Sequence, residues 1–106
     1  MAPKRVVLDA YVVETLMPDL VGHDRSPAAY LLYLYLWLET ESGTRACAAS
    51  YQTLAANTGL SKRTVQVAIA HLLARGLVAV KRAYATALPE YRVRKPWARR
   101  AGQQSV

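Results

Sequence analysis

The sequence contains a single cysteine, Cys47. One thiol cannot form a disulfide within the chain, and together with His23 and His71 it makes a poor set of metal ligands. A chain with one thiol fits a reduced, intracellular environment best. Apolar residues make up 53% of the sequence, enough for a packed core. We therefore expect a folded protein that needs neither a metal nor a cofactor.

Long hydrophobic runs are also missing. The most apolar stretch, residues 28–38, has 11 residues, whereas a helix needs roughly 20 to span a bilayer. The opening MAPKRVVLDA lacks the apolar centre of a signal peptide. These two absences predict a soluble protein of the cytoplasm with no membrane partner.

Acidic residues are nearly absent from the second half of the chain. Residues 62–106 carry ten basic side chains and only Glu90, a balance of +9, whereas residues 1–61 carry four basic and six acidic side chains, a balance of −2. A basic half of this kind indicates a polyanionic partner. Composition alone leaves nucleic acid, anionic lipid and an acidic protein open.

Patterns that carry catalysis are lacking as well. The sequence has no glycine-rich phosphate loop and no nucleophile elbow, and its acidic residues show no paired spacing typical of acid–base chemistry. Asp19 and Asp24 flank His23, but one histidine between two acids is insufficient to predict a metal or active site. We expect a protein that is not an enzyme and has no evident small-molecule ligand.

The length of 106 residues allows one domain. Residues 1–25 are predicted to form an N-terminal arm, in which Asp9 caps a short helix over 10–17. Pro18 should end that helix, because proline disfavours helical geometry in the residue before it. Residues 18–25 are then expected to be a loop.

Ser26 and Pro27 form a strong helix start, because serine accepts from a free amide and proline is preset for the first helical position. This helix should run to about Glu41 and end at Ser42-Gly43. Its sequence is apolar nearly all round, which is typical of a central, buried helix. A homodimer seam through residues 27–41 and a ligand or lipid site are the alternatives.

Two shorter helices are predicted next, over 51–57 and 62–75. Ser50 and Ser61 are their caps, and Gly59 lies between them in a position suited to positive φ. On a helical wheel, the inward face of the second of these helices consists of Val65, Ala68, Ile69, Leu72 and Leu73. The outward face consists of Arg63, Gln66, Val67, Ala70 and Ala74, with Lys62, Thr64 and a surface His71 at the flanks.

The remaining pattern is that of strands. Residues 44–49 are predicted to form a short strand, and the alternation after Gly76 predicts a hairpin of strands 77–82 and 90–95. We expect Val80 to pair with Val93, a register that places Lys81 opposite Arg92. Like charges in such positions destabilise a strand pair, so the hairpin is expected to meet a negative partner. A solvated edge that resists aggregation is the alternative.

Residues 96–106 are predicted to be a basic, flexible tail. Arg99 and Arg100 are expected to be mobile, with an ordered clamp as the alternative. Trp97 is expected to pack the start of the tail onto the domain, with stacking on a partner as the alternative. The domain proper is then 26–95, in the order helix, short strand, helix, tight turn, helix and two-stranded hairpin.

The stretch from the second helix into the hairpin resembles the winged helix-turn-helix superfamily, and within it the DNA-binding domains of GntR-like regulators and of replication-initiation proteins. The residues that carry the resemblance are Ser50-Tyr51-Gln52-Thr53-Leu54-Ala55, Gly59-Leu60-Ser61, Arg63-Thr64-Val65, Leu72-Leu73 and Arg75-Gly76-Leu77-Val78. The likeness covers about residues 27–95. It implies an α+β fold, mostly α with a small β-hairpin, in which three core helices carry a two-stranded wing.

The resemblance also implies a partner and a set of contacts. Double-stranded DNA would be bound with the helix over 62–75 in the major groove, as in a nucleoid-associated transcriptional regulator. The implied contacts are Tyr51, Gln52, Ser61, Lys62, Arg63, Thr64, Gln66, Lys81, Arg82, Arg92 and Arg94. Two alternatives remain: a replication or plasmid-maintenance protein, and a protein-interaction module that uses the apolar outward residues Val67, Ala70 and Ala74.

Overall fold

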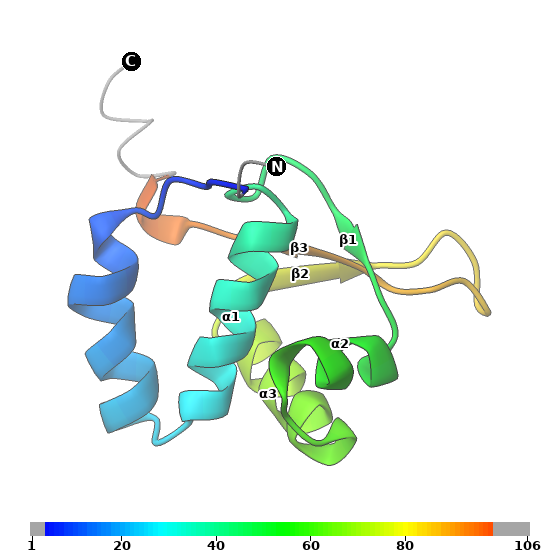
Figure 1. Ribbon diagram of the computed structural model, residues 1–106, viewed down its shortest axis with the longest axis horizontal. Helices are drawn as coiled ribbons and strands as arrows, with labels where there is room; N and C mark the ends of the chain where they lie inside the picture. Colours follow the sequence, from blue (N-terminus) through cyan, green and yellow to red (C-terminus); the bar gives the residue numbers. More distant parts are fainter. Residues whose placement is uncertain (1–3, 99–106) are drawn as a thin grey trace.

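A computed structural model describes residues 4–98 of the protein, so the expectations for Arg99 and Arg100 lie outside the described residues. The longest apolar helix, α1 (Pro27–Glu39), lies in the middle of the fold. Figure 1 shows the N-terminal helical segment on one side of α1, and two further helices with a small sheet on the other. This arrangement covers α1 from several directions.

Helix α1 begins as the sequence predicts. The Ser26 hydroxyl accepts from the amide of Ala29 at 3.3 Å, and Pro27 occupies the first helical position. The helix is the centre of the core, which confirms the prediction of a buried helix. Its buried side chains are Ala29, Tyr30, Leu32, Tyr33, Leu36 and Trp37.

The turn after α1 begins two residues earlier than predicted. Glu41, Ser42 and Gly43 all have positive φ, of 49°, 63° and 89°. A Cβ on Gly43 would lie 3.1 Å from the Cγ2 atom of Val93. A glycine at this position therefore lets the turn pass close to the sheet.

The N-terminal arm is more helical than predicted. The segments η1 (Val12–Leu16) and η2 (Pro18–His23) are wound with i→i+5 hydrogen bonds, so the prediction that Pro18 ends a helix and begins a loop is wrong. Pro18 is tolerated because it occupies the first position of η2, where a missing amide costs little. The apolar side of the arm packs into the core, with Leu20 fully buried.

Helices α2 (Tyr51–Thr58) and α3 (Lys62–Ala74) form the predicted pair, each capped by a serine. Gly59 ends α2 in the left-handed conformation, with φ of 81° and its amide bonded to the carbonyl of Ala55. The inward face of α3 packs as predicted except for Leu73, which is 37% exposed. The break at Gly59 gives α3 a direction independent of α2.

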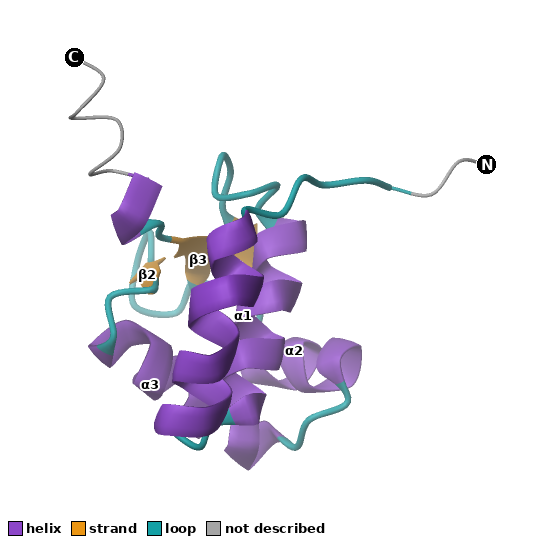
Figure 2. Ribbon diagram, turned by 90° about the vertical axis from the view of Figure 1, so that its left-hand side faces the viewer, coloured by secondary structure: helices purple, strands orange, loops and turns teal. Residues whose placement is uncertain are grey.

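The sheet has three antiparallel strands in the order β1-β3-β2. They are β1 (Cys47–Ala48), β2 (Val78–Lys81) and β3 (Glu90–Val93), all shorter than predicted. The first strand joins the predicted two-stranded hairpin, so β3 is central. The helices and this sheet together make a winged helix-turn-helix fold of the α+β class (Figure 2).

The predicted register of the hairpin is wrong by two residues. Val93 pairs with Val78, and Val80 pairs with Tyr91. The reason is burial: Val78 and Val80 share the face of Tyr91 and Val93, but Val78 is buried and Val80, nearer the loop, is 42% exposed, so buried Val93 pairs with buried Val78. Lys81 therefore lies opposite Glu90, and Arg92 lies opposite Ala79. The predicted clash of like charges does not exist.

The first and last described segments pack together on α1. The rings of Tyr11 and Trp97 stack with centroids 4.3 Å apart, and Trp97 lies nearly parallel to Trp37 at 6.4 Å. Trp97 Nε1 donates to the Asp9 carboxylate at 3.1 Å, and Trp37 Nε1 donates to the Val7 carbonyl at 2.9 Å. The prediction for Trp97 is confirmed, whereas the prediction that Asp9 caps a helix is wrong because its side chain bonds Trp97 instead.

Within residues 4–98, every helix is too short or too polar to cross a lipid bilayer.

The Gly59 turn can be tested by substitution. Gly59→Ala should lower the free energy of unfolding by about 1–2 kcal/mol, because a Cβ disfavours left-handed geometry even in open space. Gly22→Ala is the matched control, since Gly22 is helical, lacks positive φ and has no atom near its Cβ position. Alanine there should leave stability unchanged or raise it slightly. Urea unfolding measures both, and equal effects would contradict the role given to Gly59.

Candidate nucleic-acid interface

The amino end of α3 presents two free positive charges. Lys62 and Arg63 are exposed, and neither forms an ion pair among the described residues. The hydroxyl of Ser61 accepts from the Thr64 amide at 3.0 Å and donates to the Thr64 hydroxyl at 2.8 Å, which fixes the first turn. Cations at a helix amino end are mildly unfavourable, by about 0.3–1 kcal/mol each. An anionic partner would relieve that repulsion.

A groove joins this helix end to the wing. We call it the helix-start groove, and its volume is about 310 Å³. Its lining combines the start of α2, Lys62 of α3 and the loop between β2 and β3, and it contains two cationic side chains and no acidic one. The lining residues are Ser50, Tyr51, Gln52, Lys62, Arg82, Thr86, Ala87, Leu88 and Pro89. Four of the predicted contacts therefore lie in one concavity.

The helix-start groove also has backbone donors available. The first amides of an α-helix have no partner within the helix. In α2, the Thr53 amide donates to the Ser50 hydroxyl at 3.1 Å, and the Leu54 amide donates to the Ser50 carbonyl. Within the described part of the chain, the amides of Tyr51 and Gln52 have no hydrogen-bond partner, and both residues line the groove. Such amides beside a lysine and an arginine suit a phosphate oxygen.

Arg82 shapes the wing as well as lining the groove. Its guanidinium donates to the Ala87 carbonyl at 2.7 Å and so spans the loop between β2 and β3. Because arginine has five donors, the remaining N–H groups stay available to a ligand. No pattern in the sequence predicts this bond across the loop.

The outward face of α3 is only partly polar. Arg63 is exposed, Gln66 is half-buried, and Val67 is 54% exposed. Ala70 and Ala74 are exposed farther along the helix. Polar groups able to read base edges are therefore concentrated in the first turn and a half of α3.

The other predicted wing residues lie elsewhere. Arg92 and Lys81 belong to the face of the sheet opposite Tyr91 and Val93, away from the core. The Arg92 guanidinium donates to the Gly43 carbonyl at 3.3 Å. Arg94 follows β3 at the end of the hairpin far from the loop. The structure thus brings together Tyr51, Gln52, Ser61, Lys62, Arg63, Thr64 and Arg82, and sets Arg92 and Arg94 apart from them.

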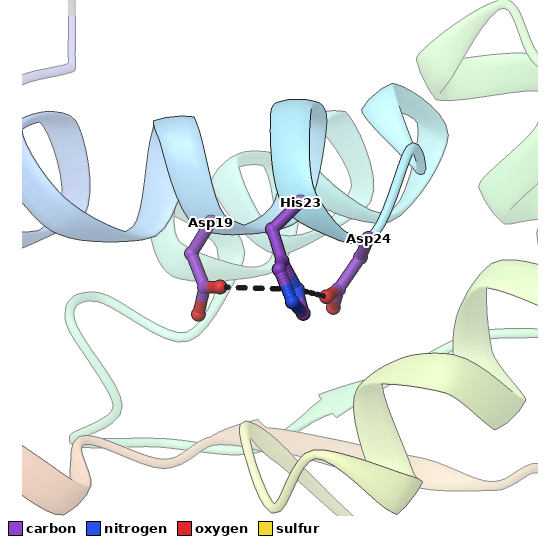
Figure 3. Close-up of side chains that lie close together, drawn as sticks. All are labelled: Asp19, His23 and Asp24. Atoms are coloured by element: carbon purple, nitrogen blue, oxygen red, sulfur yellow. Dashed lines mark hydrogen bonds and ion pairs between the residues drawn. The ribbon is translucent and has the colours of Figure 1, made fainter.

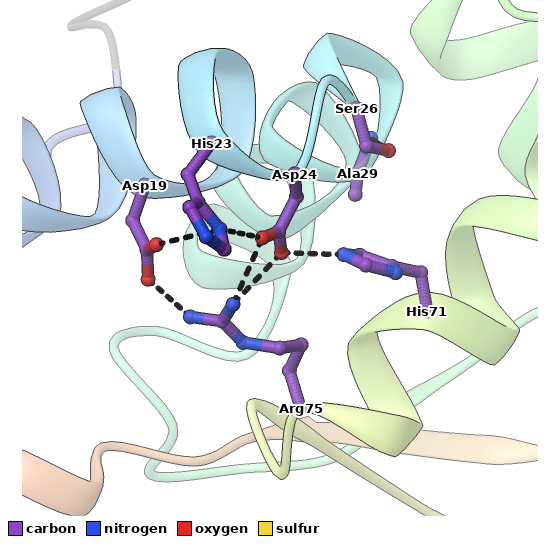
Figure 4. A network of polar contacts seen from close by, with 7 residues as sticks. All are labelled: Asp19, His23, Asp24, Ser26, Ala29, His71 and Arg75. Atoms are coloured by element: carbon purple, nitrogen blue, oxygen red, sulfur yellow. Dashed lines mark hydrogen bonds and ion pairs between the residues drawn. The ribbon is translucent and has the colours of Figure 1, made fainter.

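The carboxyl end of α3 is anchored by a charge cluster that the sequence did not reveal. Arg75 pairs with Asp19, and its guanidinium donates to Asp24 at 2.9 Å. His71 Nε2 donates to the same Asp24 carboxylate at 2.7 Å (Figure 4). His71, expected at the surface, is half-buried by this contact. The cluster joins η2 to α3 across some 50 residues of sequence.

The same acids form the one group of three possible metal ligands among the described residues. Ligand atoms of Asp19, His23 and Asp24 lie within 4.8 Å of one another (Figure 3). Arg75 already bonds both carboxylates, so its guanidinium stands where a cation would bind. The arrangement is that of an ion-pair network that holds two helices together.

Cys47 has the environment of a small core residue. Burial, followed by the charge of Glu39, raises the pKa of its thiol above the usual value of 9.0. A thiol that stays protonated is a weak nucleophile.

Comparison with known protein families matches residues 26–78, half of the chain, to the family described as helix-turn-helix domain. The match runs from the cap of α1 through α2 and α3 to the first residue of β2. Neither the curated proteins nor the solved structures contain a match to this chain.

The anchor of α3 makes a prediction about pH. Hydrogen bonds from His23 and His71, together with the charge of Arg75, hold the pKa of Asp24 below its ordinary value of 3.8. The contribution of Asp24 to stability is therefore complete above that value and is lost as the pH falls below it. Asp24→Asn should lower the melting temperature at neutral pH and flatten the loss of stability on acidification. Glu14→Gln, at an exposed position, is the control and should change neither.

Proposed function

The chain belongs to the helix-turn-helix domain family, and on that premise we propose that it binds double-stranded DNA through the amino end of α3 and the helix-start groove. The observation that carries this proposal is the meeting of Lys62, Arg82 and the free amides of α2 in one concavity. Phosphate is the ligand that such a set of donors suits best. The exposed first turn of α3 would then enter the adjacent major groove.

The proposed contacts divide by role. Tyr51, Gln52, Lys62 and Arg82 would hold the sugar–phosphate backbone, because they line the groove. Arg63 would reach base edges or a second phosphate, and an arginine at such a position suits a guanine. Ser61, Thr64 and Gln66, the other predicted contacts near the start of α3, already serve the cap or are half-buried, so they would add weaker contacts.

We propose transcriptional regulation as the biological role, on the strength of the resemblance of residues 50–78 to GntR-like regulators. The replication or plasmid-maintenance alternative rests on the same residues. A map of bound genomic sites separates the two, because regulators gather at promoters and initiators at origin repeats.

Dimerisation through residues 27–41 is a separate hypothesis. Most of α1 is covered by other elements, and the large apolar side chains it exposes are Leu31 and Leu38, at 49% and 37%. A dimer seam on α1 would have to use these two leucines. Sedimentation that finds only monomer at high concentration would remove this hypothesis.

The charged start of α3 gives the principal test. Lys62→Ala with Arg63→Ala should weaken binding to duplex DNA by about 100-fold, since each charge-assisted hydrogen bond contributes about 1.5–3 kcal/mol. The slope of log K against log salt should flatten by about 1–2. Folding stability should be unchanged, because both side chains are exposed. Fluorescence anisotropy with labelled duplex, after selection of a target from a random pool, measures these effects.

Arg45→Ala is the matched control for that experiment. Arg45 is exposed and pairs with Glu41 at 3.0 Å, outside the helix-start groove. Its loss should leave DNA affinity nearly unchanged. Equal losses in the control and the double variant would indicate a nonspecific charge effect and contradict the proposed interface.

The protein-interaction alternative is favoured by one observation, the 54% exposure of Val67 on the outward face of α3. Binding of a partner protein through this apolar contact should depend little on salt. Binding of duplex DNA through about six phosphate contacts should give a slope of log K against log salt near −5. A salt titration of the purified chain with duplex therefore distinguishes the two functions.

A further inference from the structure

A second, larger groove lies at the other end of α3. We call it the basic groove, and its volume is about 870 Å³. It is lined by Leu73 and Gly76 at the end of α3, by β2, and by β3 with the residues that follow it. The lining residues are Leu73, Gly76, Val78, Ala79, Val80, Arg92, Arg94, Lys95 and Pro96. This lining contains three cationic side chains and no acidic one.

The basic groove is distinct from the helix-start groove. The two share no lining residue. Helix α3 has 13 residues and so separates its two ends by about 20 Å. Arg94 lies four residues beyond Glu90, the first residue of β3, a distance of about 13 Å along an extended strand. The proposed duplex contacts at the amino end of α3 and the basic groove therefore lie at different places on the molecule.

The charges of the basic groove are available to a ligand. The Arg94 guanidinium has no acidic partner among residues 4–98, and Arg92 bonds only the Gly43 carbonyl, at 3.3 Å. Lys95 lies over the Trp37 ring, with Nζ 5.1 Å from the centroid. Two arginines with free donors suit carboxylates, which they can hold in bidentate pairs.

Part of the lining of the basic groove is apolar and exposed. Leu73 and Val80 are 37% and 42% exposed. A phosphate backbone gains nothing from covering such side chains, whereas a peptide with apolar residues between its acids buries them. The combination of apolar and cationic lining residues therefore favours an acidic peptide over a nucleic acid.

The open edge of β2 favours an extended peptide in particular. The Arg94 amide donates to the Leu77 carbonyl at 2.8 Å, and in an antiparallel pair the residues that bond the neighbour alternate. Leu77, Ala79 and Lys81 thus bond β3, while the N–H and C=O of Val80 face the open side. Since β2 is an edge strand, an added strand can pair there.

We propose that the basic groove binds an extended acidic segment of a partner protein. Apolar side chains of that segment cover Leu73 and Val80, and its carboxylates pair with Arg92 and Arg94. This interaction goes beyond the proposed function, since it requires no DNA and uses none of the residues at the start of α3.

The test measures peptide binding to the full chain by fluorescence anisotropy. The probe is a labelled peptide in which glutamate alternates with leucine. Two control peptides of equal length replace its glutamates by glutamine or its leucines by serine. The probe should bind more tightly than either control. Arg92→Ala with Arg94→Ala should weaken its binding by about tenfold or more. These substitutions leave the bond from the Tyr33 hydroxyl intact, because it is accepted by the Arg94 backbone carbonyl.

Matched variants separate this site from the DNA interface. Val80→Ser, at an exposed position, should weaken peptide binding and leave DNA binding unchanged. Lys62→Ala with Arg63→Ala should do the reverse. The proposal is overturned if the glutamine peptide binds as well as the probe, or if no peptide binds. It is also overturned if the Arg92 and Arg94 variant loses DNA affinity while keeping the peptide, because these arginines would then be duplex contacts.

Discussion

Helix α1 is apolar around most of its circumference, and the rest of the fold is arranged by the need to remove that surface from water. The pair of α2 and α3 cannot cover α1 alone, so η1, η2 and the sheet pack against its remaining sides. This constraint explains why the N-terminal arm is ordered: Val12, Leu16 and Leu20 complete the cover that α2 and α3 leave open. It also explains why Trp97 returns to the same helix and stacks beside Trp37. In this arrangement the inward face of α3 packs against α1, and its outward face remains exposed.

The charges of α3 are arranged unequally along its length. Arg75 at the carboxyl end is favoured by the helix dipole and is neutralised by Asp19 and Asp24. Lys62 and Arg63 at the amino end oppose the dipole and have no acidic partner among the described residues. The acidic half of the sequence thus anchors one end of α3 and leaves the other end positive. An interface for an anion requires such a separation, because a uniformly neutralised helix would attract nothing.

Local signals predicted the helices well. Ser26-Pro27 and Ser61 marked helix starts and Gly59 marked a helix end, because capping depends on residues within one turn. Contacts between residues far apart in the sequence could not be predicted in the same way. The register of β2 and β3 depends on which valine the helices bury, and the cluster of Asp24, His71 and Arg75 depends on how η2 meets α3. For the site, the sequence predicted Lys62, Arg63 and Arg82 among the contacts, which stay predictions, but it could not show that Arg92 and Arg94 line a different groove from Lys62 and Arg82.

The composition of the α3 face limits how much sequence information a single copy can extract from DNA. Arg63 and the half-buried Gln66 are the polar side chains that could hydrogen-bond to base edges. Farther along the outward face lie Val67 and Ala70, which can contact a thymine methyl or respond to the shape of the groove but cannot hydrogen-bond to a base. Most of the affinity of the proposed complex would therefore come from phosphate, which carries no sequence information. Recognition of a particular site then requires a further contribution, from a second copy or from a partner protein. The basic groove lies where such a partner could bind without displacing the duplex, so the two surfaces are compatible with one regulatory assembly.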